Sequence, residues 1–228
     1  KVVWLRKHKP DVYRRLRWIL LPHDFLNWYL TGEKTMEYGD ASGTAFLDVR
    51  NRRWSAEVLR AMDPSRDLCE CLPPLLGPDR LSGFLCARAS GKLGLPKGIP
   101  VSTGGGDNMM GAIGTGACSP GILTVSLGTS GTLYGFSDRP VIDPEGNLAA
   151  FCSSTGGWLP LLCTMNCTVA TEVTRKLLGA DIPGLEKKAA ASRPGSGGLV
   201  LLPFFNGERT PNLPYGRGCL MGMTMTNF

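Results

Sequence analysis

Two short polar segments of the chain contain the residue types that could carry out chemistry. The first, Gly104–Asn108, places a carboxylate and an amide directly after three glycines. The second, Ser126–Gly131, is a Gly-Thr-Ser turn that follows an apolar run. A carboxylate can accept a proton from a hydroxyl, and a glycine-rich turn that carries hydroxyls can bind phosphate oxygens. Together the two segments predict phosphoryl transfer.

Asp107 is the candidate base. Three preceding glycines would let a substrate approach closely, and Asn108 could hold a neighbouring sugar hydroxyl. A carboxylate is a weak base for an alcohol, but phosphoryl transfer depends mainly on positioning and charge stabilisation, with late loss of the proton. The alternative is an ordinary glycine turn in which Asp107 caps the following helix. Taken alone, this alternative explains the pattern at least as well.

Gly128, Thr129 and Ser130 form the tip of the second segment, where backbone N–H groups and two hydroxyls could bind phosphate. The alternative is a tight hairpin whose polar residues face water, and the pattern does not separate the two. Three familiar motifs are absent. The chain has no Walker sequence and no nucleophile elbow, and its first glycine segment breaks the dinucleotide-binding spacing at Met109.

Two further polar groups have less specific patterns. Asp40, Ser42 and Thr44 could form a second cluster near a substrate, although a surface turn is the favoured interpretation. Glu208 and Arg209 could contact a nucleotide, but neighbours of this kind more often stabilise a loop.

The elements that must position these segments follow from hydrophobic spacing and from prolines and glycines. Apolar residues recur at helical spacing from Val2 to about Trp28, and breaks at Pro10 and Pro22 divide this stretch into three helices. The other predicted elements are a loop over residues 36–44, a short helix over 54–62, a buried strand over 99–103, a helix over 109–116, a β-hairpin of strands 122–126 and 132–136, further strands within 151–162, helices over 168–178 and 186–191, and a strand over 199–205.

Composition excludes several classes of protein. Among the 228 residues, 43% are hydrophobic and 19% charged, and no apolar run is long enough for a membrane span. The net charge of +6 comes largely from basic residues near the N-terminus and in residues 50–53, without the interleaved aromatics of single-strand binders. A solvated face is therefore favoured over nucleic-acid binding. The eight cysteines lack zinc-type spacing, and His8 and His23 have no second ligand pattern near them. The cysteines are therefore predicted to be buried, reduced thiols in a cytoplasmic protein.

Five segments in order resemble one protein family, the FGGY carbohydrate kinases, and within it the members that act on pentuloses. The segments are Leu21–Asn27 with Leu30–Gly32, Gly39–Thr44, Gly104–Asn108, Ser126–Gly131 and Gly207–Pro211. The resemblance implies an α/β fold of two ribonuclease H-like lobes of the actin and hexokinase type. By it, residues 1–119 are the later part of the sugar-binding lobe, and residues 120–228 are the beginning of the ATP-binding lobe.

The resemblance also implies roles for individual residues. Asp107 matches the catalytic base and a sugar ligand, and Asn108 matches a second sugar ligand. Gly128, Thr129 and Ser130 match a hairpin that contacts ATP, and Thr168 falls near a further nucleotide contact. The implied reaction is ATP-dependent phosphorylation of a pentulose, D-xylulose in the first place, with Mg²⁺ bridging the phosphates. The implied partners are a small-molecule sugar and ATP, and the family allows a homodimer.

Several family segments are not found. An Asp-Gly-Thr phosphate motif after an N-terminal strand is absent, as is the early sugar-binding segment, and the adenine-binding segment would be expected after Phe228. The chain therefore resembles the middle of a kinase, with both lobes incomplete, and we expect little or no turnover from it alone. Two alternatives stay open: a non-catalytic sugar-binding or regulatory protein of this fold, and a kinase for another sugar or polyol such as ribulose or glycerol.

Overall fold

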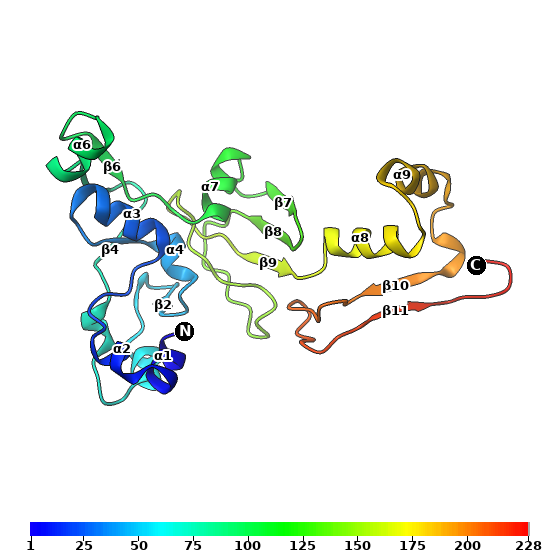
Figure 1. Cartoon of the computed structure of the whole chain (residues 1–228), viewed down its shortest axis with the longest axis horizontal. Coiled ribbons are helices and arrows are strands. Elements are labelled where there is room, and N and C mark those ends of the chain that lie inside the picture. The colour runs from blue at the N-terminus through cyan, green and yellow to red at the C-terminus, as the bar shows by residue number, and fades with distance from the viewer. Residues whose placement is uncertain (228) are drawn as a thin grey trace. The chain divides into compact units, whose positions relative to one another are not determined.

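A computed structural model of the chain describes residues 1–227, which form two compact units (Figure 1). The first unit comprises Lys1–Leu123, Gly135–Ile142 and Ala150–Pro160. The second comprises Thr124–Tyr134, Asp143–Ala149 and the residues from Leu161 onward. The two units alternate along the chain, so they are not the same division as the lobes predicted to meet after residue 119. That lobe boundary stays a prediction.

Three helices open the first unit, as the hydrophobic spacing predicts. They are α1 (Val2–His8), α2 (Pro10–Arg14) and α3 (Pro22–Thr31). Pro10 and Pro22 each occupy a first helical position, where the missing N–H costs nothing and the fixed φ angle already suits a helix. Gly32 ends α3 in a left-handed conformation, with φ of 89°.

Residues 36–44 differ from the predicted loop. They form a short strand, β1 (Met36–Glu37), that pairs in parallel with β4 (Leu75–Leu76), and then a helix, α4 (Tyr38–Ser42). The Glu37 carboxylate starts this helix by accepting the N–H groups of Gly39 at 2.8 Å and Asp40 at 3.2 Å. A helix of five residues is too short for a periodic pattern, and its cap is not one of the usual capping residues.

The remaining elements of the first unit are short. They are β2 (Leu47–Asp48) paired with β3 (Arg53–Trp54), α5 (Ala56–Met62), a 3₁₀ turn (Leu68–Cys71), β5 (Leu81–Phe84) paired with β6 (Pro100–Ser102), α6 (Ala87–Leu93) and α7 (Asp107–Gly114). The strand predicted over residues 99–103 is present as β6, but it is not buried, because Pro100 and Ser102 are exposed. Its polar successor Thr103 is the buried residue.

Two hydrophobic clusters hold the first unit together. One joins the N-terminal helices to α5 and the 3₁₀ turn and contains Val2, Tyr13, Leu59, Leu68 and Leu72. The other lies around α4 and β2 and contains Met36, Ala41, Leu47, Val49 and Cys152. The second cluster therefore connects α4 with the distant segment that carries Cys152.

The second unit contains a three-stranded sheet and a separate β-ribbon (Figure 1). Strands β7 (Leu123–Leu127), β8 (Gly131–Gly135) and β9 (Leu161–Thr164) are neighbours in that order, which agrees with the predicted hairpin. Within residues 151–162 the structure has mainly isolated β-bridges instead of the predicted strands. The other elements are α8 (Thr168–Leu177), α9 (Ile182–Ala191), a 3₁₀ turn (Ser196–Gly198), and β10 (Val200–Pro203) paired antiparallel with β11 (Gly218–Met221).

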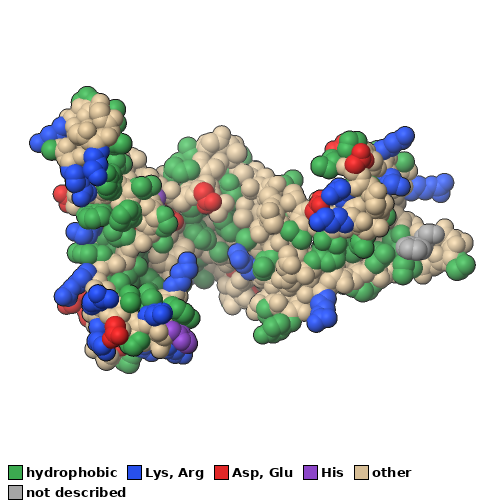
Figure 2. All heavy atoms as spheres, viewed as in Figure 1, with side chains coloured by type: hydrophobic (Ala, Val, Ile, Leu, Met, Phe, Trp, Pro, Cys, Tyr) green, Lys and Arg blue, Asp and Glu red, His purple; other side chains and the backbone are tan. Residues whose placement is uncertain are grey.

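The basic residues near the N-terminus lie on the surface. Figure 2 shows Lys and Arg side chains gathered around the part of the first unit that holds α1 and α2. All eight cysteines are free, but only Cys71 and Cys152 are buried and Cys219 is exposed, so burial was predicted correctly for few of the thiols. Among the helices of residues 1–227, none combines the length and apolar content that crossing a membrane requires.

The hydrophobic cluster around α5 leads to a stability prediction. Leu59 is 2% exposed, so Leu59→Ala should lower the free energy of unfolding by about 2–5 kcal/mol, since truncation leaves a cavity. The matched control is Val58→Ala on the same helix, where the side chain is 38% exposed and the change should stay within about 0.5 kcal/mol. Urea denaturation followed by circular dichroism measures both, and equal effects would contradict the assigned core.

Candidate functional site

The candidate base stands at the start of a helix and is open to solvent. Asp107 is the first residue of α7, and the cap position before it is Gly106, which makes no side-chain capping bond. The Asp107 carboxylate accepts the N–H of Asn108 at 2.8 Å and is otherwise exposed. Asn108, the candidate sugar ligand, is half-buried beside it. A carboxylate exposed in this way is open to a hydroxyl from solution, and the role of Asp107 as base stays a prediction.

The three glycines before Asp107 pass close to side chains, so that a Cβ on any of them would be tightly confined. Gly104 has a φ of 70°, a left-handed conformation that favours glycine. A Cβ on Gly105 would lie 2.6 Å from Ser154 Oγ, and one on Gly106 would lie 3.1 Å from Asp40 Oδ1. The glycine turn therefore packs closely on two polar side chains, Ser154 and Asp40, just before α7 begins.

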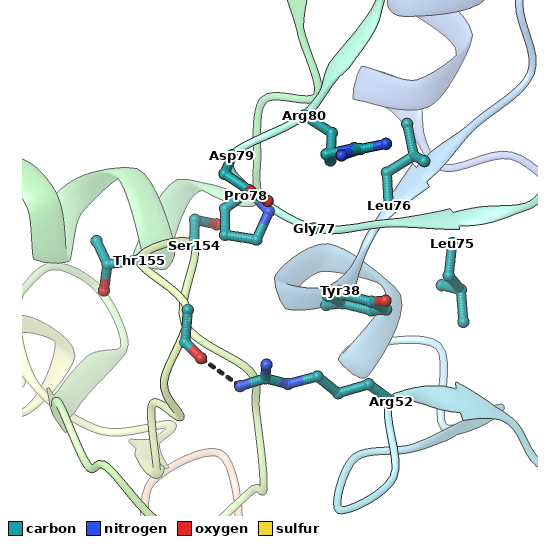
Figure 3. Close-up of a pocket in the computed structure, with 11 residues that line it drawn as sticks. Tyr38, Arg52, Leu75, Leu76, Gly77, Pro78, Asp79, Arg80, Ser154 and Thr155 are labelled. Atoms are coloured by element: carbon teal, nitrogen blue, oxygen red, sulfur yellow. Dashed lines mark hydrogen bonds between the residues drawn. The ribbon is translucent and has the colours of Figure 1, made fainter.

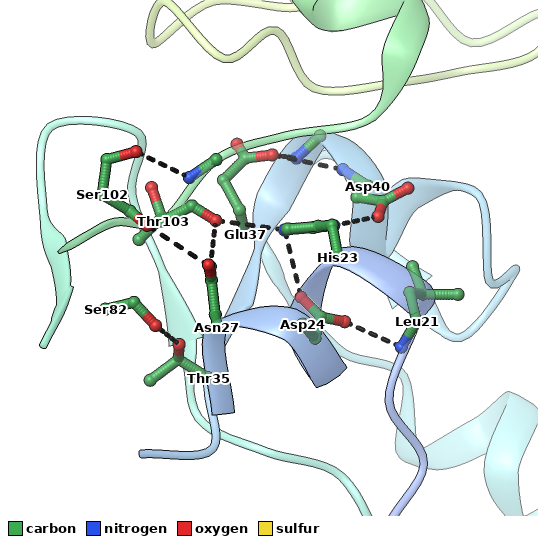
Figure 4. A network of polar contacts seen from close by, with 12 residues as sticks. Leu21, His23, Asp24, Asn27, Thr35, Glu37, Asp40, Ser82, Ser102 and Thr103 are labelled. Carbon is green, nitrogen blue, oxygen red and sulfur yellow. Dashed lines mark hydrogen bonds and ion pairs between the residues drawn. The ribbon is translucent and has the colours of Figure 1, made fainter. Parts of the chain in front are cut away.

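Those polar side chains form a network under the turn, which we call the α3–α4 network (Figure 4). It consists of His23, Asp24 and Asn27 from α3, with Glu37 and Asp40 at the start of α4. His23 Nδ1 is hydrogen-bonded to Asp40, and His23 Nε2 lies 3.1 Å from the carbonyl oxygen of Thr103 and 3.2 Å from Asp24 Oδ1.

The network also holds the chain that leads into the glycine turn. The Asn27 amide Nδ2 donates to the Thr103 carbonyl at 2.8 Å, and the Glu37 carboxylate accepts the Ser154 hydroxyl at 3.2 Å. Asn27, Glu37 and Thr103 are all buried. Because buried polar groups are costly to leave unpaired, these contacts fix the end of β6 relative to α3 and α4.

Burial changes the protonation of the network. It raises the pKa of Asp24 to about 6 against the opposing effects of the Leu21 N–H bond and the His23 charge. Burial likewise raises the pKa of Glu37, although its backbone hydrogen bonds oppose this. For His23, burial favours the neutral ring, but the hydrogen bond with Asp40 and the charges of Asp24 and Asp40 outweigh it, so the pKa is raised overall.

Sequence reasoning missed most of this network. The sequence pattern tests His23 only as a metal ligand, singles out neither Asp24 nor Glu37, and favours a surface turn for Asp40. That assignment is wrong, because Asp40 contacts His23 and the glycine turn. One local signal was available: proline at the first position of α3 and a carboxylate two residues later, which accepts the N–H of Leu21 at 2.9 Å, mark a helix start.

A pocket of about 750 Å³ adjoins the network in the first unit (Figure 3). Its wall is stabilised by Arg52, which donates to the carbonyl oxygens of Gly156 and Gly157 and stacks on the ring of Trp158 at 4.4 Å. The lining residues are Tyr38, Arg52, Leu75, Leu76, Gly77, Pro78, Asp79, Arg80, Ser154, Thr155 and Gly156. Ser154 also lies against Gly105, so one lining residue of the pocket packs on the glycine turn.

The second unit brings together all the residues predicted to contact a nucleotide. Gly128, Thr129 and Ser130 form the exposed tip between β7 and β8, and α8 begins at Thr168 beside it. The carbonyl oxygen of Gly128 accepts the N–H of Thr168 at 3.0 Å, and that of Thr129 accepts the N–H of Cys167 at 3.2 Å. A hydroxyl-bearing tip next to a helix N-terminus suits phosphate oxygens.

A buried carboxylate supports the start of α8. Glu208 is 4% exposed and accepts the N–H groups of Met165 at 2.6 Å and Arg209 at 2.7 Å. Its second oxygen accepts Asn166 Nδ2 at 3.0 Å. Glu208 therefore joins the loop after β10 to the segment just before α8, as the favoured loop interpretation predicts. No group of three or more His, Cys, Asp or Glu side chains suited to a metal ion occurs in the described part of the chain.

The sequence of the chain matches a known protein family. Residues 1–114 match the N-terminal domain of the FGGY family of carbohydrate kinases. The chain belongs to the FGGY family. The xylulose kinase of Haemophilus influenzae is 44% identical over 228 residues, which are 100% of this chain and 46% of that protein. The chain thus spans about half the length of the curated relatives it matches.

Solved structures of FGGY proteins match the fold. A crystal structure of a xyloylose kinase from Brucella ovis has a TM-score of 0.90 at 33% identity, and the match covers 98% of this chain and 46% of the Brucella chain. The crystal structure of the xylulose kinase from Bifidobacterium adolescentis has a TM-score of 0.85 at 33% identity, and the match covers 99% of this chain and 49% of the Bifidobacterium chain. The predicted fold class, ribonuclease H-like lobes of the actin and hexokinase type that are incomplete in this chain, is confirmed.

The left-handed glycine of the turn can be tested by substitution. Gly104→Ala should lower the free energy of unfolding by about 1–2 kcal/mol, because a Cβ is strained in the left-handed region. The added carbon would also lie 3.3 Å from the ring of His23. The control Gly114→Ala, in α7 with open space around it, should leave stability unchanged or raise it by up to about 1 kcal/mol. Loss of stability in the control alone would contradict the assigned turn.

The buried carboxylate of the second unit predicts an acid dependence. Burial favours the protonated form of Glu208, but its hydrogen bonds with Asn166 and the backbone outweigh this and lower its pKa below the ordinary value. A lowered pKa in the folded state contributes stability above the unfolded value of about 4.3, and the contribution disappears as pH falls through the folded value. Stability of the wild type should therefore decline below about pH 4.3.

Glu208→Gln should reduce that acid dependence and cost about 1–3 kcal/mol at pH 7, because an amide NH₂ would face N–H donors. Urea denaturation at pH 3.5 to 7 compares it with Glu186→Gln, an exposed carboxylate on α9. An unchanged acid profile in Glu208→Gln would show that the loop does not depend on this charge.

Proposed function

We propose that this chain is part of an ATP-dependent pentulose kinase that transfers the γ-phosphoryl group of ATP to the 5-hydroxyl of D-xylulose. The observation that carries the proposal is the 44% identity with a xylulose kinase over the whole chain, combined with a solvent-open carboxylate at Asp107. In this proposal residues 1–119 belong to the sugar-binding lobe and residues 120–228 to the ATP-binding lobe.

Asp107 is the proposed base, and Asn108 the proposed sugar ligand beside it. As the sugar oxygen forms its bond to the γ-phosphorus, the bond from that phosphorus to the bridging oxygen of ADP breaks, and the hydroxyl proton passes to Asp107. Proton loss is late in such transfers, so the main task of the carboxylate is to orient the hydroxyl. Its solvent-open position at the end of a glycine turn supports this role.

Gly128, Thr129, Ser130 and Thr168 are the proposed ATP contacts. The exposed hydroxyls at the hairpin tip can donate to phosphate oxygens, and the N-terminus of α8 adds a favourable dipole. Mg²⁺ supplies charge neutralisation when it is bound to the phosphates, which are its natural oxygen ligands. The proposed compartment is the cytoplasm. A homodimer stays a prediction from the family alone.

The proposed base gives a direct test in protein expressed from the full reading frame that encodes this chain. Asp107→Asn should lower kcat for ADP release with D-xylulose by about 10²–10⁴-fold, since general-base catalysis contributes on this order. The sugar KM should change much less. The control is Asp138→Asn, whose side chain is 74% exposed and lies outside the site.

A coupled ADP assay with a panel of ketoses and polyols measures both variants. Turnover with ribulose or glycerol instead of D-xylulose would replace the substrate but keep the kinase. Sugar binding without ADP release from any substrate would contradict the kinase and favour a non-catalytic sugar-binding protein. Residues 1–228 alone provide a further comparison, for which we expect little or no turnover.

A further inference from the structure

The ring of His23 has an oxygen atom beside each of its nitrogens. Nδ1 faces the carboxylate of Asp40, and Nε2 faces both the carbonyl of Thr103 at 3.1 Å and Asp24 Oδ1 at 3.2 Å. A neutral imidazole carries one N–H, so one of its nitrogens would present a lone pair to an oxygen. Only the imidazolium donates from both nitrogens. The geometry therefore favours a positively charged ring.

His23 contacts the glycine turn at its beginning, and Asp40 contacts it at its end. Thr103, whose carbonyl accepts from Nε2, directly precedes Gly104, and a Cβ on Gly104 would lie 3.3 Å from the His23 ring. Asp40, which accepts from Nδ1, lies against Gly106. The ring thus connects Thr103, which precedes the turn, with Asp40, which lies against its end. The glycines between them have no side chains that could restrain the turn.

We propose that His23 is a positioning residue whose charged ring clamps the Gly104–Gly106 turn and thereby places Asp107 for proton transfer. The clamp is formed when the ring is protonated and released when it is neutral. This inference rests on the proposed role of Asp107 as the base. It assigns His23 no contact with the substrate.

The charges around His23 set the direction of the pH response. The groups that face it are Asp24 on its own helix and Asp40 on α4, with Glu37 acting on Asp24 from the end of β1. Burial opposes the charged ring, but the hydrogen bond with Asp40, the charges of Asp24 and Asp40 and the Thr103 carbonyl exceed this effect, so the pKa of His23 is raised. A raised pKa keeps the clamp closed below about 6.5 and opens it as pH rises through the folded value.

Asn27 limits how far the turn can move when His23 loses its proton. Its amide donates to the same Thr103 carbonyl at 2.8 Å and does not titrate, so the end of β6 stays attached when the ring loses its proton. Release of the clamp should therefore loosen the turn without unfolding the first unit. A loosened base lowers kcat, because a displacement of about 1 Å in a reacting group can cost about 10²-fold in rate.

The first test measures the ring directly and does not depend on any activity. The chain has two histidines, so His8→Gln, which replaces an exposed ring on α1, leaves His23 as the only imidazole signal. Nitrogen-15 NMR should show both ring nitrogens protonated at pH 6.5, and the amide signals of Gly104–Gly106 should shift with the same midpoint as the ring. A neutral ring at pH 6.5, or glycine amides that ignore its titration, would overturn the proposal.

The second test measures kcat and KM from pH 5.5 to 9 in the protein from the full reading frame. In the wild type, kcat should decline as pH rises through the pKa of His23. His23→Gln should lower kcat about 10–100-fold and remove this alkaline decline, with KM for the sugar changing much less. His23→Lys keeps a cation to a pH of about 10, so it should recover part of the lost kcat and shift the decline upward. His8→Gln should match the wild type.

Asp40→Asn covers the case in which His23→Gln does not fold. It removes the charge that faces Nδ1, so both the NMR midpoint of His23 and the alkaline decline of kcat should move to lower pH together. A variant whose ring midpoint falls while the kcat profile stays fixed would overturn the clamp. If no sugar is phosphorylated at any pH, the proposed kinase fails, whereas the clamp is still judged by the NMR titration.

Discussion

The candidate site depends on the close approach of a backbone turn without side chains to a buried polar network. Gly105 and Gly106 lie against Ser154 and Asp40, at distances where a Cβ would need a neighbour to move. The space is already filled by groups that the interior must pair, so neither partner can shift independently. This mutual constraint determines where α7 starts, and the start of α7 determines where the Asp107 carboxylate stands.

In the second unit a buried carboxylate, not a glycine turn, holds the start of a helix in place. Glu208 accepts hydrogen bonds from two backbone N–H groups and one amide, which fixes the segment before α8. The carbonyls of Gly128 and Thr129 then hold the hairpin tip to the first residues of α8. Both candidate tips are thus carried on buried polar groups that hydrogen-bond to the backbone around them, and rigidity of this kind is what positioned chemistry requires.

Local sequence signals predicted the elements with strong punctuation. Pro10 and Pro22 marked helix starts, and the glycines around Thr129 marked the hairpin, because each of these residues limits the backbone by itself. They did not predict α4, which depends on a carboxylate cap and on packing around Met36. His23 was missed for a related reason. Its partners Asp40 and Thr103 are distant in sequence, and only the folded chain brings them to one ring.

Exposure distinguishes the possible roles of the carboxylates in the first unit. Asp24 and Glu37 are each 1% exposed, and burial raises the pKa of both, which suits groups that support the structure. Asp40 is engaged by His23 and by the glycine turn. Asp107 alone among these four is exposed, with a single bond to its own neighbouring N–H. A hydroxyl from solution can therefore reach Asp107 without disturbing the network, and the buried carboxylates can act only through the turn that they hold in place.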